Sequence, residues 1–391
     1  MLLFKLALKN LLGAGTRTWL NVAVTSFSFV LIVFMSGFYQ GFLEYAQQVT
    51  LETQVAGGAY WHPAYDPDDP FTLDEAHGIP PGPVSEQLAT GDAMPILLTQ
   101  GSIYPEGRMM PVMIKGIPPD QNIVTLPTAV LGEYTGSAIP VLIGAGMAHS
   151  AQLEIGDVFT VRWRDARGTY DADEAEVISV MRVENPGVDV GQLWLPLEKL
   201  RDMLEMPGEA TYVVAASGTE LLTDIGEWQP KPVIFFMQDY LDVIEMKSSN
   251  AKVMYAVLLA MAAMGIFNSQ VLSIFRRRKE IGTLMALGMI RSRVVALFTA
   301  EGGMHSILAF ILGAIWGGPL LFLVATKGIP LPYDPTEFGV IMAPRLMGVY
   351  GVSMILGTTL LVAIIVTVVS YIPAHKIAKL KPTEALTGRS N

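Results

Sequence analysis

Cysteine is absent from the 391-residue sequence, and charged residues make up only 16% of it. The lack of cysteine excludes thiol chemistry, disulfide scaffolds and metal sites built on cysteine. Soluble domains carry about 25% charged residues, so the low charge excludes an ordinary water-soluble enzyme. Hydrophobic residues make up 51% of the chain and gather in four long runs. This composition indicates a membrane protein.

The four apolar runs have the length of membrane-spanning helices. They cover 20–41, 253–275, 294–325 and 346–372, and only the third contains a charged residue, Glu301. About 20 apolar residues cross the hydrocarbon core as a helix. The third run is also interrupted by a Gly-Gly-Pro sequence at 317–319, so we expect it to tilt or to extend beyond the bilayer.

The distribution of charge predicts the orientation of the chain. The segments before the first run, between the second and third, and after the fourth hold 13 basic and two acidic residues. The segment 43–249 holds 10 basic and 31 acidic residues. Because basic segments stay on the cytoplasmic side, we expect both termini in the cytoplasm and 43–249 outside.

The predicted fold is four transmembrane α-helices with a large α+β extracytoplasmic domain between helices 1 and 2. Short, partly alternating runs in 43–249 predict a mainly antiparallel sheet. Helices are expected at 144–153, 196–204 and 220–228, whereas 60–84 is too rich in proline for regular structure. An apolar spacing from about Gln238 predicts one continuous helix into the second run.

These patterns divide the chain into nine predicted segments. They are a cytoplasmic amphipathic N-terminus (1–18), transmembrane helix 1 (19–42), the periplasmic α+β domain (43–249), transmembrane helix 2 (250–275), a cytoplasmic loop helix (276–293), transmembrane helix 3 (294–325), an extracytoplasmic loop (326–345), transmembrane helix 4 (346–372) and a cytoplasmic tail (373–391).

No catalytic constellation stands out in the acidic segment. Its three histidines lack metal-binding spacing, and no Gly-x-Ser-x-Gly motif is present. Asp66, Asp68 and Asp69 favour a solvated acidic loop over a calcium loop, because prolines separate them and the distal glutamate is missing. Basic clusters occur only beside the apolar runs, which excludes a nucleic-acid site. We therefore expect no catalytic residue, metal or cofactor on this chain.

Two glycine pairs lie within the apolar runs. Gly37-x-x-x-Gly41 and Gly313-x-x-x-Gly317 would permit close helix contact. A dimer contact and glycines simply tolerated in a membrane helix explain these pairs equally well.

The basic loop between the second and third runs has a helical pattern. Ile281, Leu284 and Leu287 or Gly288 recur at helical spacing behind a cluster of basic residues. This spacing fits an amphipathic helix at the membrane surface. It fits equally a docking helix whose apolar ridge enters a groove on a soluble partner.

Several segments together resemble one family. The sequence RRRKEIGTLMALGMIRSRVVALFTAEG at 276–302 resembles the signature of the MacB/FtsX/Lol (type VII, lipoprotein-releasing-like) ABC transporter permeases. The stretch 141–158 and the opening at Asn10 are similar to other parts of that family. The ending at 371–386 resembles its terminal motif, with Pro373, Ala374, Pro382, Glu384, Ala385 and Leu386 at the matching positions.

The resemblance implies a mechanism and partners. Such permeases lie in the bacterial inner membrane as homo- or heterodimers and bind a dimer of ABC ATPase subunits, which hold ATP and magnesium. The chain lacks the Gly-x-x-x-x-Gly-Lys-Ser/Thr motif, so we expect the ATPase on a separate subunit and no enzymatic activity here. The loop would be the coupling helix that contacts the ATPase, through Arg277, Arg278, Glu280, Ile281, Gly282, Leu284, Leu287 and Gly288.

Glu301 and His305 are the polar residues of the third run. Glu301 lies about 12 Å along the helix from Arg293 and matches an acidic position that follows the coupling region in the family. His305 is four residues further on, so we expect it to share the face of Glu301 and to be the candidate partner of that carboxylate. A structural hydrogen bond and a proton relay are both considered, and the structural role is favoured.

The resemblance favours a lipoprotein-releasing permease, which moves its external domain without passing the cargo through a channel. Such a protein must shelter acyl chains, because each methylene contributes about 0.8 kcal/mol to membrane binding. The candidate lipid cleft consists of Phe34, Gly37, Phe38, Gly41 and Phe42. The alternatives are MacB-like efflux of a drug or peptide and FtsX-like regulation of a cell-wall hydrolase without transport.

Overall fold

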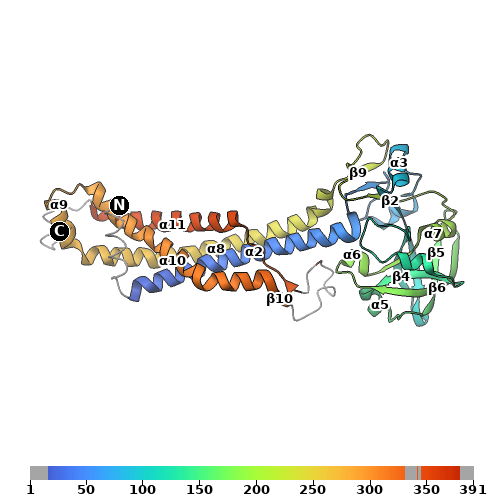
Figure 1. Ribbon diagram of the computed structural model, residues 1–391, viewed down its shortest axis with the longest axis horizontal. Coiled ribbons are helices and arrows are strands. Elements are labelled where there is room, and N and C mark those ends of the chain that lie inside the picture. The colour runs from blue at the N-terminus through green and yellow to red at the C-terminus, as the bar shows by residue number, and fades with distance from the viewer. Residues whose placement is uncertain (1–15, 331–340, 342–344, 379–391) are drawn as a thin grey trace. The chain divides into compact units, whose positions relative to one another are not determined.

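The computed structural model describes residues 16–330, 341 and 345–378, which belong to two compact units (Figure 1). The helical unit holds the described residues of 16–42, 243–330 and 345–378. The α+β domain holds residues 43–242.

Four long helices among the described residues are apolar enough to cross a membrane. They are α2 (Thr16–Thr50), α8 (Val233–Arg276), α10 (Arg291–Lys327) and α11 (Val352–Ala378). The α+β domain lies between α2 and α8 in the chain. The predicted fold class, four membrane helices with a large α+β domain between the first two, is therefore confirmed.

Two of these helices bear on expectations from the sequence. The 44 residues of α8 form one helix, as predicted from the spacing after Gln238. The Gly-Gly-Pro sequence at 317–319 does not end the helix, because α10 continues through Pro319 to Lys327. A backbone in lipid must form its hydrogen bonds within the helix. Proline removes only one of these bonds, so α10 continues past Pro319.

The last apolar run becomes helical later than expected. Residues Arg345–Leu346 form β11, which pairs antiparallel with β10 (Ile329–Pro330). Consequently α11 begins only at Val352. A separate short helix, α9 (Arg278–Ala286), follows α8.

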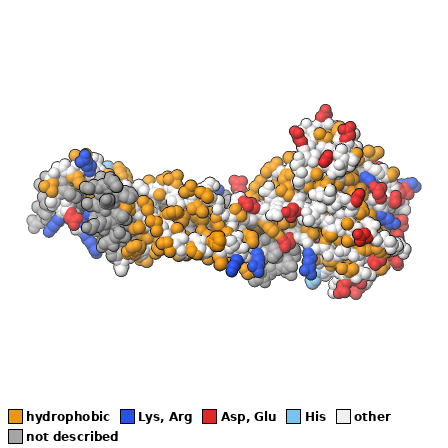
Figure 2. Space-filling model, viewed as in Figure 1, with side chains coloured by type: hydrophobic (Ala, Val, Ile, Leu, Met, Phe, Trp, Pro, Cys, Tyr) orange, Lys and Arg blue, Asp and Glu red, His pale blue; other side chains and the backbone are white. Residues whose placement is uncertain are grey.

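The helical unit carries its apolar side chains both inside and outside. Phe29, Val33, Ile266, Val362 and Val366 form a buried cluster that joins α2, α8 and α11. Hydrophobic side chains also cover the surface of the helices (Figure 2). An apolar outer surface is expected where lipid replaces water.

The α+β domain is built on nine strands and several short helices. The strands are β1 (Ala59–Trp61), β2 (Ala93–Tyr104), β3 (Met110–Ile117), β4 (Ile139–Gly144), β5 (Val158–Arg164), β6 (Tyr170–Met181), β7 (Gln192–Pro196), β8 (Tyr212–Ala215) and β9 (Gln229–Lys231). The helices are α3 (Gly82–Thr90), α4 (Ala129–Glu133), α5 (Ala145–Ala151), α6 (Pro186–Asp189) and α7 (Leu197–Leu204), with a π-helical turn (Leu51–Val55) and 3₁₀ turns (Pro70–Asp74 and Pro105–Gly107).

The strands of the domain form a closed ring with an extension. Hydrogen-bonded neighbours run β2-β3-β7-β4-β6-β5 and return to β2, while β8, β1 and β9 continue from the first half of β2. The pairs β3–β7 and β4–β6 are parallel and the other pairs are antiparallel. The prediction of a mainly antiparallel sheet is thus confirmed.

Side chains that alternate between the two faces of the strands form two hydrophobic cores. Ile114, Val141 and Leu193 join a cluster that includes α5 and α7, whereas Leu142 and Trp194, one residue along, join a second cluster with β1 and β8. Successive side chains of a strand point to opposite faces, so both faces of these strands are covered.

Two glycines of the 141–158 motif allow a buried cap on α5. Both oxygens of the Asp189 carboxylate accept a hydrogen bond from the Gly146 amide at 3.0 Å. A side chain on Gly144 or Gly146 would overlap Asp189. The carboxylate therefore occupies the positive end of α5, in place of a capping side chain from the helix's own start.

Two expectations for this domain are wrong. Residues 220–228 form turns rather than a helix, and Ile225 and Trp228 from this segment are buried in the domain. The proline-rich stretch 60–84 contains regular structure, including the 3₁₀ turn at Pro70 and the start of α3. Proline suits the first turn of a helix, where its missing N–H group has no partner to lose.

Candidate coupling site

The helix α9 is separated from its neighbours by two breaks in the backbone. Arg277, between α8 and α9, leaves the helical conformation with φ −99° and ψ 15°. After α9 the amide of Gly288 donates to the Met285 carbonyl, and Gly288 has φ +93°. Glycine adopts this left-handed conformation without steric cost and commonly ends a helix. The chain then enters α10 at Arg291.

Arg277 connects α9 to α10. Its Nε donates to Glu280 Oε2 at 2.9 Å, and its Nη1 donates to Glu301 Oε2 at 3.0 Å. Its guanidinium also lies 5.1 Å from the centre of the Phe298 ring on α10. The Glu301 side chain is only 5% exposed, whereas that of Glu280 is 65% exposed. One guanidinium therefore joins a buried carboxylate of α10 to an exposed carboxylate of α9.

This arrangement corrects the expected partner of Glu301. His305 Nδ1 lies 3.2 Å and 3.1 Å from the backbone oxygens of Glu301 and Gly302, so the histidine bonds to the backbone of its own helix. Its Nε2 atom is buried and has no hydrogen-bond partner among the described residues. Sequence spacing within α10 suggested His305, but the charge that balances Glu301 comes from Arg277, 24 residues earlier.

A small apolar core lies beside this ion pair. It consists of Ile274 from α8, Val294 and Phe298 from α10, and Ala374 from α11, with Met285 of α9 packed against it. Ala374 belongs to the terminal motif, as does the buried Pro373. The remaining predicted tail residues lie outside the described residues: Pro382, Glu384, Ala385 and Leu386.

The other predicted coupling residues occupy different environments. Gly282 is buried, whereas Leu287 is 80% exposed just after α9. Ile290, which the sequence pattern missed, is 57% exposed three residues later. The side chains of Arg278, Ile281 and Leu284 lie outside the described part of the structure. Leu287 and Ile290 define an exposed apolar surface, which we name the loop surface.

A polar contact between three helices was also missed from the sequence. Gln270 of α8 and Ser370 of α11 are both buried, and both face Gly302 of α10. A side chain at Gly302 would overlap Ser370 and lie 3.1 Å from the amide nitrogen of Gln270. Glycine thus allows α10 to approach α8 and α11 one residue after Glu301.

The candidate lipid cleft needs correction, because its glycines do not face an open space. A side chain at Gly37 would overlap the ring of Tyr350, and one at Gly41 would overlap the Met347 carbonyl. The amide of Val349 donates to the Gly37 carbonyl at 2.9 Å. The chain's own segment before α11 therefore fills the notch that the glycines create.

The aromatic residues of the candidate lipid cleft and the second glycine pair also pack against other residues of the chain. Phe34 and Phe38 have ring centres 6.5 Å apart, and both, like Phe42, are partly exposed. Gly317 packs against Val30 of α2, where an added side chain would lie 2.5 Å away. The Gly313 pair therefore serves contact between helices of one chain.

The acidic group at Asp66 has a structural role. Its carboxylate accepts from the Asp68 amide at 3.0 Å, and the Asp69 carboxylate accepts from the Phe71 amide at 3.0 Å. Among the described residues no group of three histidine or carboxylate side chains has the geometry of a metal site.

Comparison with known proteins identifies a family for residues 252–382. The family described as FtsX-like permease C-terminal matches residues 252–382, which contain α9 and the Arg277–Glu301 pair. The chain is similar to an uncharacterized ABC transporter permease of Methanocaldococcus jannaschii, with 30% identity over 133 residues, or 34% of this chain and 31% of that protein.

Two further relatives carry more specific names. The macrolide export ATP-binding/permease protein MacB of Neisseria meningitidis serogroup A is 26% identical over 234 residues, which cover 54% of this chain and 33% of that protein. The pyoverdine export ATP-binding/permease protein PvdT of Pseudomonas entomophila is 26% identical over 132 residues, which cover 34% of this chain and 18% of that protein. Each match thus spans a third or less of the relative's length.

The matched region and the geometry describe the same part of the molecule. It contains α9, which the sequence predicts to be the coupling helix, the ion pair that joins α9 to α10, and two further apolar helices long enough to cross a membrane. From this agreement we conclude that residues 252–382 form an FtsX-like permease domain and that the chain is similar to ABC transporter permeases, MacB among them.

Proposed function

We propose that this permease couples ATP hydrolysis on a separate ATPase subunit to movement of its α+β domain. The observation that carries the proposal is the double ion pair of Arg277, which ties α9 to Glu301 of α10. Force applied to α9 would reach α10 through Arg277 and α8 through the backbone. Because α8 begins at Val233 within the α+β domain, the same helix leads from the coupling site to that domain.

The partner in this proposal is a dimer of ABC ATPase subunits, with ATP and magnesium bound there. The loop surface of Leu287 and Ile290 supports docking, since exposed apolar residues beside charged ones suit a protein groove. A second permease copy, identical or similar, would complete the assembly. The excess of basic residues in these segments supports a cytoplasmic position for this end of a protein held in the inner membrane.

The cargo we propose is a lipoprotein taken from the inner membrane. A cavity of about 560 Å³ between α2 and α10 supports an apolar cargo, because Val24, Phe27, Leu312 and Trp316 are among its lining residues. It replaces the glycine notch as the candidate site for acyl chains. The competing cargo is a drug or peptide exported as the names of the MacB relatives describe, and the same cavity would suit its apolar part.

The docking step is tested by Leu287→Glu in the full chain, with the ABC ATPase that co-purifies with the unaltered protein. We expect the variant to insert into membranes normally but to lose most of the bound ATPase. The control is Ile155→Glu, which alters an equally aliphatic residue that is 65% exposed on the α+β domain. Equal ATPase binding by both variants would refute docking on the loop surface.

The coupling step is tested by Arg277→Ala, with the neighbouring Arg276→Ala as control. In proteoliposomes the Arg277 variant should keep the ATPase bound while losing cargo-dependent turnover. If its cargo-dependent turnover matched that of the Arg276 variant, the ion pair would not transmit force.

The cargo is tested by supplying vesicles with either a triacylated lipoprotein or a macrolide. Release of the lipoprotein to a soluble acceptor, abolished by Phe27→Asp, is the expected result. Phe71→Asp is the control, because Phe71 is 91% exposed on the α+β domain. Macrolide transport without lipoprotein release would replace the proposed cargo by the efflux cargo.

A further inference from the structure

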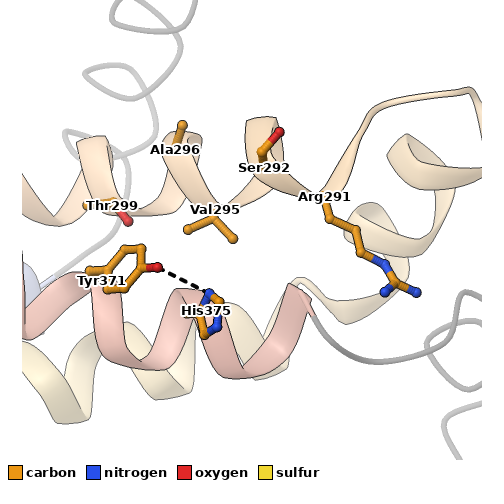
Figure 3. Close-up of a pocket in the computed structure, with 7 residues that line it drawn as sticks. All are labelled: Arg291, Ser292, Val295, Ala296, Thr299, Tyr371 and His375. Atoms are coloured by element: carbon orange, nitrogen blue, oxygen red, sulfur yellow. Dashed lines mark hydrogen bonds between the residues drawn. The ribbon is translucent and has the colours of Figure 1, made fainter.

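A second cavity lies between α10 and α11, beside the coupling site but separate from its ion pair. It has a volume of about 500 Å³ (Figure 3). Its lining residues come from the first turns of α10 and the last turns of α11: Arg291, Ser292, Val295, Ala296, Thr299, Tyr371 and His375. None of them belongs to the Arg277 ion pairs, although Val295 also packs against the small apolar core beside those pairs.

One end of the cavity suits an anion. Arg291 and His375 lie toward this end, and Ser292 is a further lining residue, with its hydroxyl directed away from α11 (Figure 3). Arg291 has no ion-pair partner among the described residues. It is also the first residue of α10, and the first amides of a helix present N–H groups and a partial positive charge. A phosphate group would complement this end.

The rest of the cavity suits a hydrocarbon chain. Val295 points toward α11, where Tyr371, which is 46% exposed, lies opposite it, and Ala296 lines the cavity from another side of α10 (Figure 3). Thr299 also lines this part, and its hydroxyl oxygen is buried and has no hydrogen-bond partner among the described residues. An occupant that brought an acceptor to Thr299 would satisfy this group.

We propose that this cavity binds one anionic phospholipid from the leaflet at the basic end of the helical unit. The phosphate contacts Arg291, Ser292 and His375. One acyl chain lies along Val295, Ala296 and Tyr371, and Thr299 donates to an ester carbonyl of the lipid. Free phosphate would use only the polar end and leave the apolar walls uncovered, so the cavity fits a lipid better than a soluble anion. The site is independent of the cargo proposed above.

The proposal is tested with the full chain in nanodiscs that contain equal amounts of phosphatidylglycerol and phosphatidylcholine. After transfer to detergent, native mass spectrometry measures which lipid remains bound. We expect the unaltered protein to retain phosphatidylglycerol, and Arg291→Ala to retain about fivefold less, as expected for one arginine at an anionic surface. Arg293→Ala is the matched control, since Arg293 belongs to the same exposed turn but does not line the cavity.

Two further variants separate a lipid from other occupants. Ala296→Phe fills the apolar part of the cavity and should abolish retention of phosphatidylglycerol. Thr299→Val is nearly isosteric and should reduce that retention, so it provides the test if Ala296→Phe does not fold. Equal retention of the two lipids, an equal loss in Arg293→Ala, or displacement by inorganic phosphate would overturn the proposal. So would disulfide cross-linking of Ala296→Cys between two copies of the chain, because the cavity would then be a subunit contact.

Discussion

The two units of this protein differ in the kind of side chain that they expose on their surfaces. In the α+β domain Ile114, Leu142 and Leu193 are fully buried, and acidic groups lie on the surface (Figure 2). In the helical unit Phe322 is 71% exposed, whereas Glu301 is 4% exposed. The comparison shows two solvents acting on one chain, because water favours apolar groups inside and lipid does not.

Polar groups stabilise the two units in different ways as a result. The buried Asp189 of the α+β domain bonds to a nearby backbone amide and completes a turn and a helix end. In the helical unit polar side chains connect separate helices, such as Asn21 to Ser269 at 2.7 Å and Arg277 to Glu301. Where packing against lipid gives no hydrophobic driving force, such links and close contacts hold helices together.

The largest expected effect comes from breaking the buried ion pair. Arg277→Met should lower the free energy of unfolding of the helical unit by about 3–5 kcal/mol, because Glu301 would remain buried without its partner. The double variant Arg277→Met/Glu301→Met should recover most of that loss. Unfolding of the full chain in mixed detergent micelles measures both.

An exposed ion pair of the α+β domain provides the contrast to the buried pair of Arg277 and Glu301. Arg164 and Asp74 are 2.8 Å apart but 48% and 68% exposed. Arg164→Met should therefore cost less than about 1 kcal/mol. Equal losses of unfolding free energy in the Arg164 and Arg277 variants would mean that burial does not determine how much an ion pair contributes to stability.

A smaller effect is expected from filling the glycine notch on α2. Gly41→Ala would push a methyl group into the Met347 carbonyl, and overpacking of this kind costs about 1–3 kcal/mol. Gly357→Ala is the control, because no atom lies within 4 Å of the added group. Thermal unfolding of both variants in detergent checks the difference, and an unaffected Gly41 variant would show that the segment before α11 does not pack there.

A pH-dependent effect on stability is expected from Lys115 in the α+β domain. Burial lowers the pKa of Lys115 to about 7 from its usual value of 10.5, and the Trp194 ring, 4.8 Å from Nζ, only partly compensates. Between these pH values the unfolded chain binds more protons than the folded one. Stability should therefore rise with pH by about 1.4 kcal/mol per unit from pH 7 to 10.5 and be lowest below pH 7.

Two substitutions test this pH dependence. Lys115→Met should remove the rise and stabilise the domain at neutral pH. Lys115→Arg should also remove the rise, but by leaving the domain less stable than the unaltered protein above pH 7, because arginine keeps its charge. Denaturant unfolding followed by tryptophan fluorescence measures both. A rise that persists in Lys115→Met would assign it to another group.

Different parts of the structure were predictable for different physical reasons. The spans could be read from the sequence, because crossing lipid requires a long run of apolar residues whatever surrounds it. The helical loop at Ile281 was recognisable from local spacing and its family resemblance. The turns at 220–228 were misjudged, since burial of Ile225 and Trp228 in the domain replaced the helix that local spacing favoured.

The sequence by itself determined that this protein has four apolar spans, an acidic domain after the first, and a basic loop of the MacB/FtsX type. Those properties depend on composition and short-range spacing, which can be read from the sequence without knowing which residues are in contact. Only the tertiary structure decided that Arg277 balances Glu301 and that Tyr350 fills the notch at Gly37. Such partners lie far apart in the chain, and only packing of the helices brings them together.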